Sequence, residues 1–195
     1  MKANGKARGR PRKFDQNVSL NGAVQLFKSK GYSATSLDDL AKAMGINRPS
    51  MYNAFGNKAS IYAKAIEHYF NQLSSPLEIA LAHNCIEKAF EDFFSLLLDY
   101  YCEDNLGCLA TSTMPVESIE NNDIREFYKE ITNKIDLLIL ARLKLSNTSE
   151  YSLLTARLLQ ALMQTLSLRA RSGIPRSELE TLYRFGLKTI LIKQV

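Results

Sequence analysis

Polar side chains gather at the start of one short predicted helix close to residue 50. They are Asn47, Arg48, Ser50 and Asn53. A guanidinium can pair with O6 and N7 of guanine through two hydrogen bonds, and a carboxamide can pair in the same way with N6 and N7 of adenine. A helix with such side chains at its N-terminal end can read base edges when it enters a DNA major groove. Arg48 is the strongest candidate for a base contact, and Asn53 is the next.

The elements around this helix fit a helix-turn-helix. Gly45 permits a tight turn in front of it, Asn47 can cap its first turn, and Pro49 loses no hydrogen bond there. The helix before the turn begins near residues 35–39, where two overlapping capping boxes are possible. They pair Thr35 with Asp38 and Ser36 with Asp39. Many αα-corners without a DNA role have similar spacing, so the spacing alone leaves both interpretations open.

Periodic apolar residues predict an all-α fold of about nine helices and no strand. The first stripe is Leu20, Ala23, Val24 and Phe27, and Gly31 can end that helix. A fourth helix follows from 58 to about 73, and we expect Pro76 to end it. About five longer helices are expected beyond Pro76. They are placed at about 85–101, after Gly107 with a disturbance at Pro115, at 123–145, at 149–171, and at 177–192 with a Ser177–Glu180 capping box.

Positive charge is concentrated at the N-terminus. Residues 1–14 hold six basic and no acidic side chains, whereas residues 59–195 hold fourteen basic and seventeen acidic ones. The net charge of the whole chain is +5. A cationic end on a mildly acidic body is typical of a protein of which one end meets a polyanion, although a solvated tail has the same composition.

The composition argues against a secreted protein, a membrane protein and a metal-binding protein. No apolar run approaches the roughly 18 residues of a membrane span, and no apolar segment follows the basic N-terminus as in a signal peptide. The three cysteines lack metal-ligand spacing, which favours a reducing cytoplasm. His68 and His83 fall in no acid–base or nucleophile motif, and no glycine-rich phosphate loop is present. We expect no enzymatic activity, cofactor, metal or membrane, and a cytoplasmic location.

Residues 14–70 resemble, without a gap, the DNA-binding part of TetR-type (AcrR-like) regulators. The resemblance rests on AVQLFKSKGYSATS at 23–36 and LDDLAKAMGINRPSMYNAFGNK at 37–58. GRPRKFD at 9–15 and Gly107-Cys108-Leu109 are similar to one branch of that family. The resemblance implies a basic disordered arm at 1–13, a three-helix DNA-binding domain at 14–58, and a helical ligand-binding and dimerisation domain at 59–195. The helix from 58 to about 73 would connect the two domains.

The family's DNA contacts can be carried over residue by residue. Base contacts would come from Asn47, Arg48, Pro49, Ser50 and Asn53. Phosphate contacts would come from Ser36, Tyr52 and Lys58, which fix the register on the duplex rather than read sequence. Asp38 either caps its helix, which we favour, or accepts a hydrogen bond from a cytosine. An extended arm could lay arginines into a minor groove, with Arg8, Arg10, Arg12 and Lys13 as the contacts.

The resemblance also implies partners. The last two helices, at about 149–171 and 177–192, would form a homodimer that reads the two halves of a palindromic double-stranded operator; burial within one protomer is the alternative. An unidentified small-molecule effector would bind between Cys85 and Leu145 and release a repressor from DNA. Candidate walls, each of which could equally be ordinary core, are Phe90, Phe94, Tyr101, Cys108, Met114, Phe127 and Tyr128.

Besides release by a small-molecule effector, the sequence leaves two other modes of regulation open. Cys108 follows Gly107 at a predicted helix start, where the helix dipole would favour a thiolate that responds to electrophiles or oxidants. A buried structural cysteine is the simpler interpretation. The third possibility is a DNA-binding protein that acts without any effector.

Overall fold

The computed structural model describes residues 14–145 and 153–191, which form nine α-helices and no strand. This confirms the all-α prediction within those two ranges. In chain order the helices are α1 (Gln16–Lys30), α2 (Leu37–Ala43), α3 (Arg48–Phe55), α4 (Lys58–Leu81), α5 (Ile86–Cys102), α6 (Leu109–Glu117), α7 (Asn122–Lys144), α8 (Leu153–Arg171) and α9 (Arg176–Ile190). The predicted arm at 1–13 lies outside the described residues.

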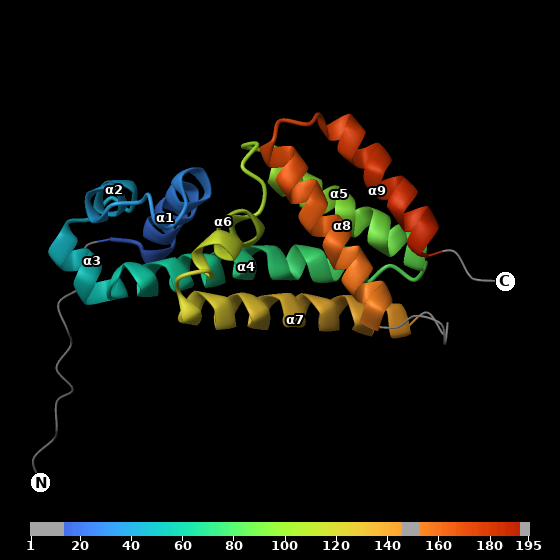
Figure 1. The fold of residues 1–195 in the computed structure, drawn as a ribbon, viewed down its shortest axis with the longest axis horizontal. Helices are drawn as coiled ribbons and strands as arrows, with labels where there is room; N and C mark the ends of the chain where they lie inside the picture. The colour runs from blue at the N-terminus through green and yellow to red at the C-terminus, as the bar shows by residue number, and fades with distance from the viewer. Residues whose placement is uncertain (1–13, 146–152, 192–195) are drawn as a thin grey trace, which may run out of the picture.

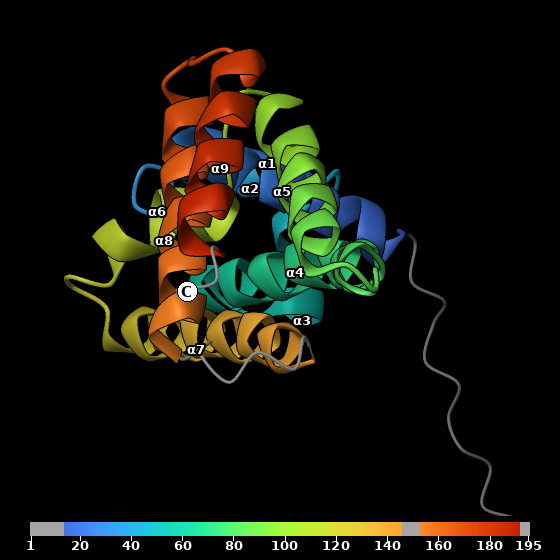
Figure 2. The ribbon, with the colours of Figure 1, turned by 90° about the vertical axis from the view of Figure 1, so that its right-hand side faces the viewer.

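The long helix α4 joins the two parts of the molecule. Figure 1 shows α1, α2 and α3 gathered at one end of α4, with α5, α8 and α9 at the other end and α6 between them. Seen from the side of α9, α8 and α9 run next to each other and α7 lies along the base of the body (Figure 2). None of the described helices is both long enough and apolar enough to cross a bilayer.

Close packing holds the small N-terminal part together. Phe27 of α1, Leu40 of α2 and Met51 of α3 are fully buried in one core. A Cβ atom on Gly22 would collide with the backbone carbonyl of Ala43, so α1 and α2 can approach this closely only because residue 22 has no side chain. The close packing of α2 on α1 therefore depends on this glycine.

The prediction that Pro76 ends the fourth helix is wrong. α4 continues through Pro76 to Leu81, although a proline inside a helix costs about 3 kcal/mol. Leu73 before the proline and Leu81 after it are both buried. Burial of a leucine side chain contributes about 1.5–3 kcal/mol, so packing on both sides offsets the missing hydrogen bond.

Two of the three predicted capping boxes do not form. α9 begins at Arg176, directly after Pro175, and Glu180 accepts a hydrogen bond from Arg176 rather than from Ser177. The Thr35–Asp38 box is also absent, because the Thr35 hydroxyl donates to the carbonyl of Gly31. The Ser36–Asp39 box forms as predicted.

Candidate nucleic-acid interface and ligand cavity

Helix α3 is anchored on one face and exposed on the other. Met51 and Phe55 are buried in the core, which fixes the rotation of the helix about its axis. The side chain of Asn47 accepts a hydrogen bond from the backbone N–H of Ser50 at 2.9 Å and so caps the helix. The exposed side then presents the predicted base-contacting side chains, of which Ser50 alone is half-buried: Asn47, Arg48, Pro49, Ser50 and Asn53.

Asp38 has a different role from the predicted cap. Asp39 completes the capping box of α2 with Ser36, whereas a carboxylate oxygen of Asp38 lies 2.6 Å from the guanidinium of Arg48. Both side chains are exposed, so the ion pair is worth at most about 1 kcal/mol. A guanidinium has five N–H donors, and one ion pair leaves enough of them for a base. Asp38 thus orients Arg48 without occupying it.

The three residues that were predicted to contact phosphate lie at the start of α2 (Ser36), on the surface of α3 (Tyr52) and at the start of α4 (Lys58). Tyr52 of α3 is exposed. Lys58 opens α4, with its ammonium 4.4 Å from the centre of the Tyr32 ring and 3.4 Å from the carbonyl oxygen of Ser33. Partial burial lowers the pKa of Lys58, and the nearby Glu117 opposes this effect. The hydroxyl of Ser36 already donates to Asp39 within the capping box.

A polar joint connects the helix-turn-helix to the body. The ammonium of Lys28, whose side chain is only 4% exposed, lies 2.7 Å from the carboxylate of Asp104 in the α5–α6 loop. Arg171 at the end of α8 donates to the backbone carbonyl of Lys28 at 2.7 Å and to that of Leu106 at 3.0 Å. Sequence reasoning missed this joint. The one signal for it is that Lys28 follows Phe27 and Val24 on the inward stripe of α1.

A second polar contact ties the turn after α1 to α6. The backbone N–H and the hydroxyl of Ser33 both donate to the carboxylate of Glu117, at the C-terminal end of α6. The hydroxyls of Tyr62 of α4 and Thr113 of α6 are hydrogen-bonded at 2.6 Å. The α6 helix therefore contacts both the N-terminal DNA-binding part (α1 to α3, called the reader below) and the connecting helix α4.

A cavity of about 720 Å³ lies among α4, α5, α6, α7 and α8. Four of the seven predicted wall residues line it: Tyr101, Cys108, Phe127 and Tyr128. Three do not, namely Phe90, Phe94 and Met114, which are fully buried in the core. Phe94, for example, stacks on Tyr183 of α9 with ring centres 5.6 Å apart.

The predicted wall residues Phe90 and Phe94 lie on one face of α5, whereas another face of that helix lines the cavity, which sequence reasoning missed. Phe93 and Leu97 line the cavity together with Tyr101, and the three recur at a helical spacing of four residues. The signal was present, but α5 is buried on two faces. Periodicity alone cannot tell which buried face borders a void.

Cys108 is the N-cap residue of α6, is 95% buried and is one of the residues that line the cavity. Its backbone N–H donates to the hydroxyl of Ser167 at 2.8 Å. A Cβ atom on Gly107 would stand 2.5 Å from the carbonyl oxygen of Ser167, so this approach of the loop to α8 requires glycine. The start of α6 is thereby fixed against α8.

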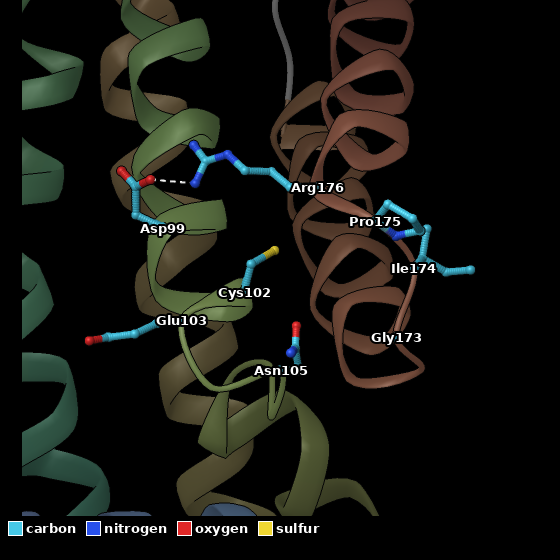
Figure 3. A pocket seen from close by; sticks show the side chains of 8 residues that line it. All are labelled: Asp99, Cys102, Glu103, Asn105, Gly173, Ile174, Pro175 and Arg176. Atoms are coloured by element: carbon cyan, nitrogen blue, oxygen red, sulfur yellow. Dashed lines mark hydrogen bonds and ion pairs between the residues drawn. The ribbon is translucent and has the colours of Figure 1, made fainter.

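A second, more open hollow of about 610 Å³ lies where the end of α5 meets the turn between α8 and α9. Figure 3 shows Arg176 reaching across it to Asp99, with Cys102 to one side of the pair. Arg176 also pairs with Glu180, so both of its neighbours are acidic side chains that hold it in place. The hollow contains none of the predicted site residues.

Neither histidine belongs to a metal-binding cluster in the described part of the chain. No group of three or more His, Cys, Asp or Glu side chains there is placed to hold a metal ion. A ring nitrogen of His68 lies 2.8 Å from the side-chain oxygen of Asn21, which links α4 to α1.

Comparison with known proteins assigns the helix-turn-helix part to a known type of domain. Residues 20–65 match the family model of bacterial regulatory proteins of the tetR family. The HTH-type transcriptional repressor ComR of Escherichia coli (strain K12) is 30% identical over 128 residues, which cover 64% of this chain and 61% of ComR. The helix-turn-helix part of the chain is thus similar to that of the tetR family. The HTH-type transcriptional repressor BdcR of the same organism is 38% identical over 69 residues, or 35% of each chain. The matched segments thus span less than two thirds of either relative.

Solved structures show that the TetR-like fold extends through the body. The TetR family regulator CifR, solved as a cysteine mutant complexed with 26bp double-strand operator DNA, superposes with a TM-score of 0.84 at 23% identity. The match covers 92% of this chain and 98% of that one. A TetR regulator from Legionella pneumophila gives a TM-score of 0.79 at 20% identity, over 92% and 99% of the two chains. At these identities the likeness concerns the fold.

The last two helices also carry large apolar side chains that are exposed in the described protomer. Leu154, Leu158 and Leu168 recur on one side of α8 and are exposed, and Phe185 of α9 is 71% exposed. Inward-facing residues of the same helices, such as Leu159 and Tyr183, are buried within the protomer. The last two helices are therefore apolar on two sides.

Proposed function

We propose that the chain is a sequence-specific DNA-binding repressor that a small molecule releases from its operator. The observation that carries the proposal is α3, a helix whose inner face is locked by Met51 and Phe55 while its N-terminal side presents Arg48 and its neighbours. Two relatives that match part of the chain are named transcriptional repressors, and a structural neighbour was solved with operator DNA. Such a protein would act in the cytoplasm, where it meets DNA.

The contacts divide into base reading and positioning. Arg48 would pair with a guanine, and Asn53 with an adenine. The side-chain oxygen of Asn47 is used by the cap, so only its amide N–H groups are available to a base acceptor. Tyr52 and Lys58 would hold the phosphates on either side. Ser36 could join them only if its hydroxyl left Asp39.

The DNA-bound form would be a homodimer. One helix-turn-helix touches too little DNA, and two copies on a palindromic site place their recognition helices about 34–36 Å apart. The exposed stripe of α8 together with Phe185 supports a partner on this face, because large contiguous apolar surface is unusual on a monomer. Two copies of α8 and α9 would bury it in a four-helix bundle.

Release would follow from the connection between cavity and reader. Cys108 at the start of α6 lines the cavity, and Glu117 at the end of the same helix binds Ser33 of the reader. A ligand that prefers a shifted α6 would change the position of the reader relative to the body. Only the difference in affinity between the two arrangements can do this, and a few kcal/mol are sufficient.

Selection from a random duplex library with the full chain tests the DNA-reading part. We expect an enriched motif with two-fold symmetry, and tight binding to it by fluorescence anisotropy. Arg48→Ala should lower specificity at one base position, whereas Lys129→Ala on α7, a matched loss of one exposed charge, should leave the motif unchanged. Equal binding to all sequences would reject a sequence-specific regulator.

A cysteine-based sensor is the second candidate. Its support is that the buried Cys108 borders the cavity, so a reagent in the cavity would reach the thiol. The Cys108→Ser variant separates this candidate from reversible binding, as described in the Discussion.

A further inference from the structure

Two neighbouring acidic side chains at the start of α2 have different surroundings. The carboxylate of Asp39 accepts hydrogen bonds from Ser36 and lies 3.1 Å from the ammonium of Lys30. The carboxylate of Asp38 lies 2.6 Å from Arg48 through one oxygen, and its other oxygen has no hydrogen-bond partner within residues 14–145 and 153–191. Asp38 can therefore accept one more hydrogen bond, whereas Asp39 is used by the fold.

Asp38 lies on the side of the reader that presents Arg48. Its side chain is 80% exposed, and Arg48, the first residue of α3, is 47% exposed. The phosphates of a bound duplex repel a carboxylate on this side. The repulsion is offset where the carboxylate meets a hydrogen-bond donor of the DNA. In the major groove these donors are the exocyclic amino groups of cytosine and adenine.

The contact between the two side chains limits how far apart their targets on DNA can lie. Two nitrogens of Arg48 would pair with O6 and N7 of one guanine. The carboxylate of Asp38 lies 2.6 Å from the guanidinium, which is less than the roughly 3.4 Å between successive base pairs. It can therefore reach the base pair that is stacked on that guanine. Cytosine and adenine offer it an N–H there, whereas guanine and thymine present an acceptor oxygen.

We infer that Asp38 and Arg48 act as one unit that reads two successive base pairs of the operator. Arg48 reads a guanine, and Asp38 reads an adjacent base that carries an exocyclic amino group. The inference rests on the DNA-reading function proposed above. The ion pair also restrains the guanidinium before DNA binds, so less side-chain freedom is lost in the complex. Asp38 is thus a specificity-determining residue outside the recognition helix.

Anisotropy titrations of the full chain with variants of the selected operator test the adjacent position. The guanine is the position that relaxes in Arg48→Ala, and all four bases are placed in turn in each of the two pairs next to it. At one of these pairs, duplexes with cytosine or adenine on one strand should bind ~10-fold more tightly than those with guanine or thymine there. Equal binding of all four bases at both pairs would overturn the inference.

The Asp38→Ala variant assigns this preference to Asp38. The variant should fold, because the capping box of α2 uses Ser36 and Asp39, and circular dichroism checks this. The preference should fall below ~3-fold, the remainder after loss of one hydrogen bond to a charged group. The affinity for random DNA should stay equal or rise, because a charge that repels phosphates is removed.

A matched control removes an acid from another exposed ion pair. Asp92→Ala on α5, where Asp92 pairs with Lys88, should change neither the preference nor the affinity for random DNA. A merely structural role of Asp38 would weaken all duplexes alike in Asp38→Ala. That result, or a retained preference at the adjacent pair, would overturn the inference.

The same experiments separate the two-base unit from the function on which it rests. A selection without any enriched motif would reject both, because no base is then read. A motif that contains the guanine, with an adjacent pair that Asp38→Ala does not affect, would retain the sequence-specific regulator and reject the role of Asp38. A motif in which Arg48→Ala relaxes no position would retain the regulator and reject the unit as a whole.

Discussion

Replacing Asp104 with asparagine should destabilise the protein through the joint between α1 and the body. Asp104 accepts two contacts: one carboxylate oxygen pairs with Lys28 at 2.7 Å, and the other accepts the backbone N–H of Leu106 at 2.9 Å. Asparagine keeps an oxygen for Leu106 but places an amide nitrogen opposite the ammonium. The substitution therefore removes the ion pair and retains the shape of the loop.

The structure sets the size of the effect. Removal of one partner from a buried ion pair costs about 3–5 kcal/mol, because the other charge stays buried and unpaired. Lys28 is 4% exposed, but the side chain of Asp104 is 26% exposed, so water reaches the site. The Tyr69 ring, with its centre 6.0 Å from the Lys28 ammonium, also stabilises the charge a little. We therefore expect a loss of about 2–3 kcal/mol in the free energy of unfolding.

A double-mutant cycle measured by urea unfolding at one fixed protomer concentration checks this value. Lys28→Met removes the charge and keeps the buried stem, so it should cost less than about 1 kcal/mol, and Lys28→Met/Asp104→Asn should show a coupling of about 2 kcal/mol. The exposed Lys88–Asp92 pair is the control, and Asp92→Asn should change stability by less than about 0.5 kcal/mol. Additive single effects at Lys28 and Asp104 would refute the reasoning.

Four further outcomes follow from the same contacts. Arg48→Ala should weaken the selected operator by about 1–3 kcal/mol in anisotropy titrations and relax one base position; equal loss on random DNA would show a phosphate contact instead. Leu158→Glu combined with Phe185→Glu should yield folded monomers in analytical ultracentrifugation, and an unchanged dimer would place the interface elsewhere. Cys108→Ser should keep ligand-induced release from DNA, whereas loss of release with retained ligand binding would favour the cysteine sensor. Glu117→Gln should leave the affinity for a cavity ligand unchanged and reduce the ligand's effect on operator affinity, both measured on one sample; full retention of that effect would exclude the α6 contact from the coupling.

Residues close in sequence were predictable, because local rules govern them. The exposed side of α3 and the Asn47 cap fall within residues 47–53, and one helix start with helical periodicity suffices to place them. The Ser36–Asp39 box is local in the same way. Asp38 was misassigned because its partner Arg48 lies on the next helix, across a turn whose geometry the sequence does not specify.

Residues far apart in sequence were beyond such rules. Lys28 and Asp104 are separated by 76 positions, and Lys28 and Arg171 by 143. No local pattern pairs a lysine on α1 with these partners. The prediction that Pro76 ends α4 was wrong for a related reason. The helix-breaking effect of proline is a local property, whereas the burial of Leu73 and Leu81 that overrides it depends on the packing of the whole body.

The α6 helix connects the cavity to the helix-turn-helix, which does not itself line the cavity. Its start is fixed, because the Cys108 N–H binds Ser167 and Gly107 packs on the same residue of α8. Its middle is held to α4 through the buried Thr113 hydroxyl. Its end contacts Ser33 through the exposed carboxylate of Glu117, and Arg125 of α7 donates to the carbonyls of Ser118 and Ile119 just beyond it. If a ligand in the cavity moves α6, we expect the change to reach the helix-turn-helix through the exposed contact between Glu117 and Ser33.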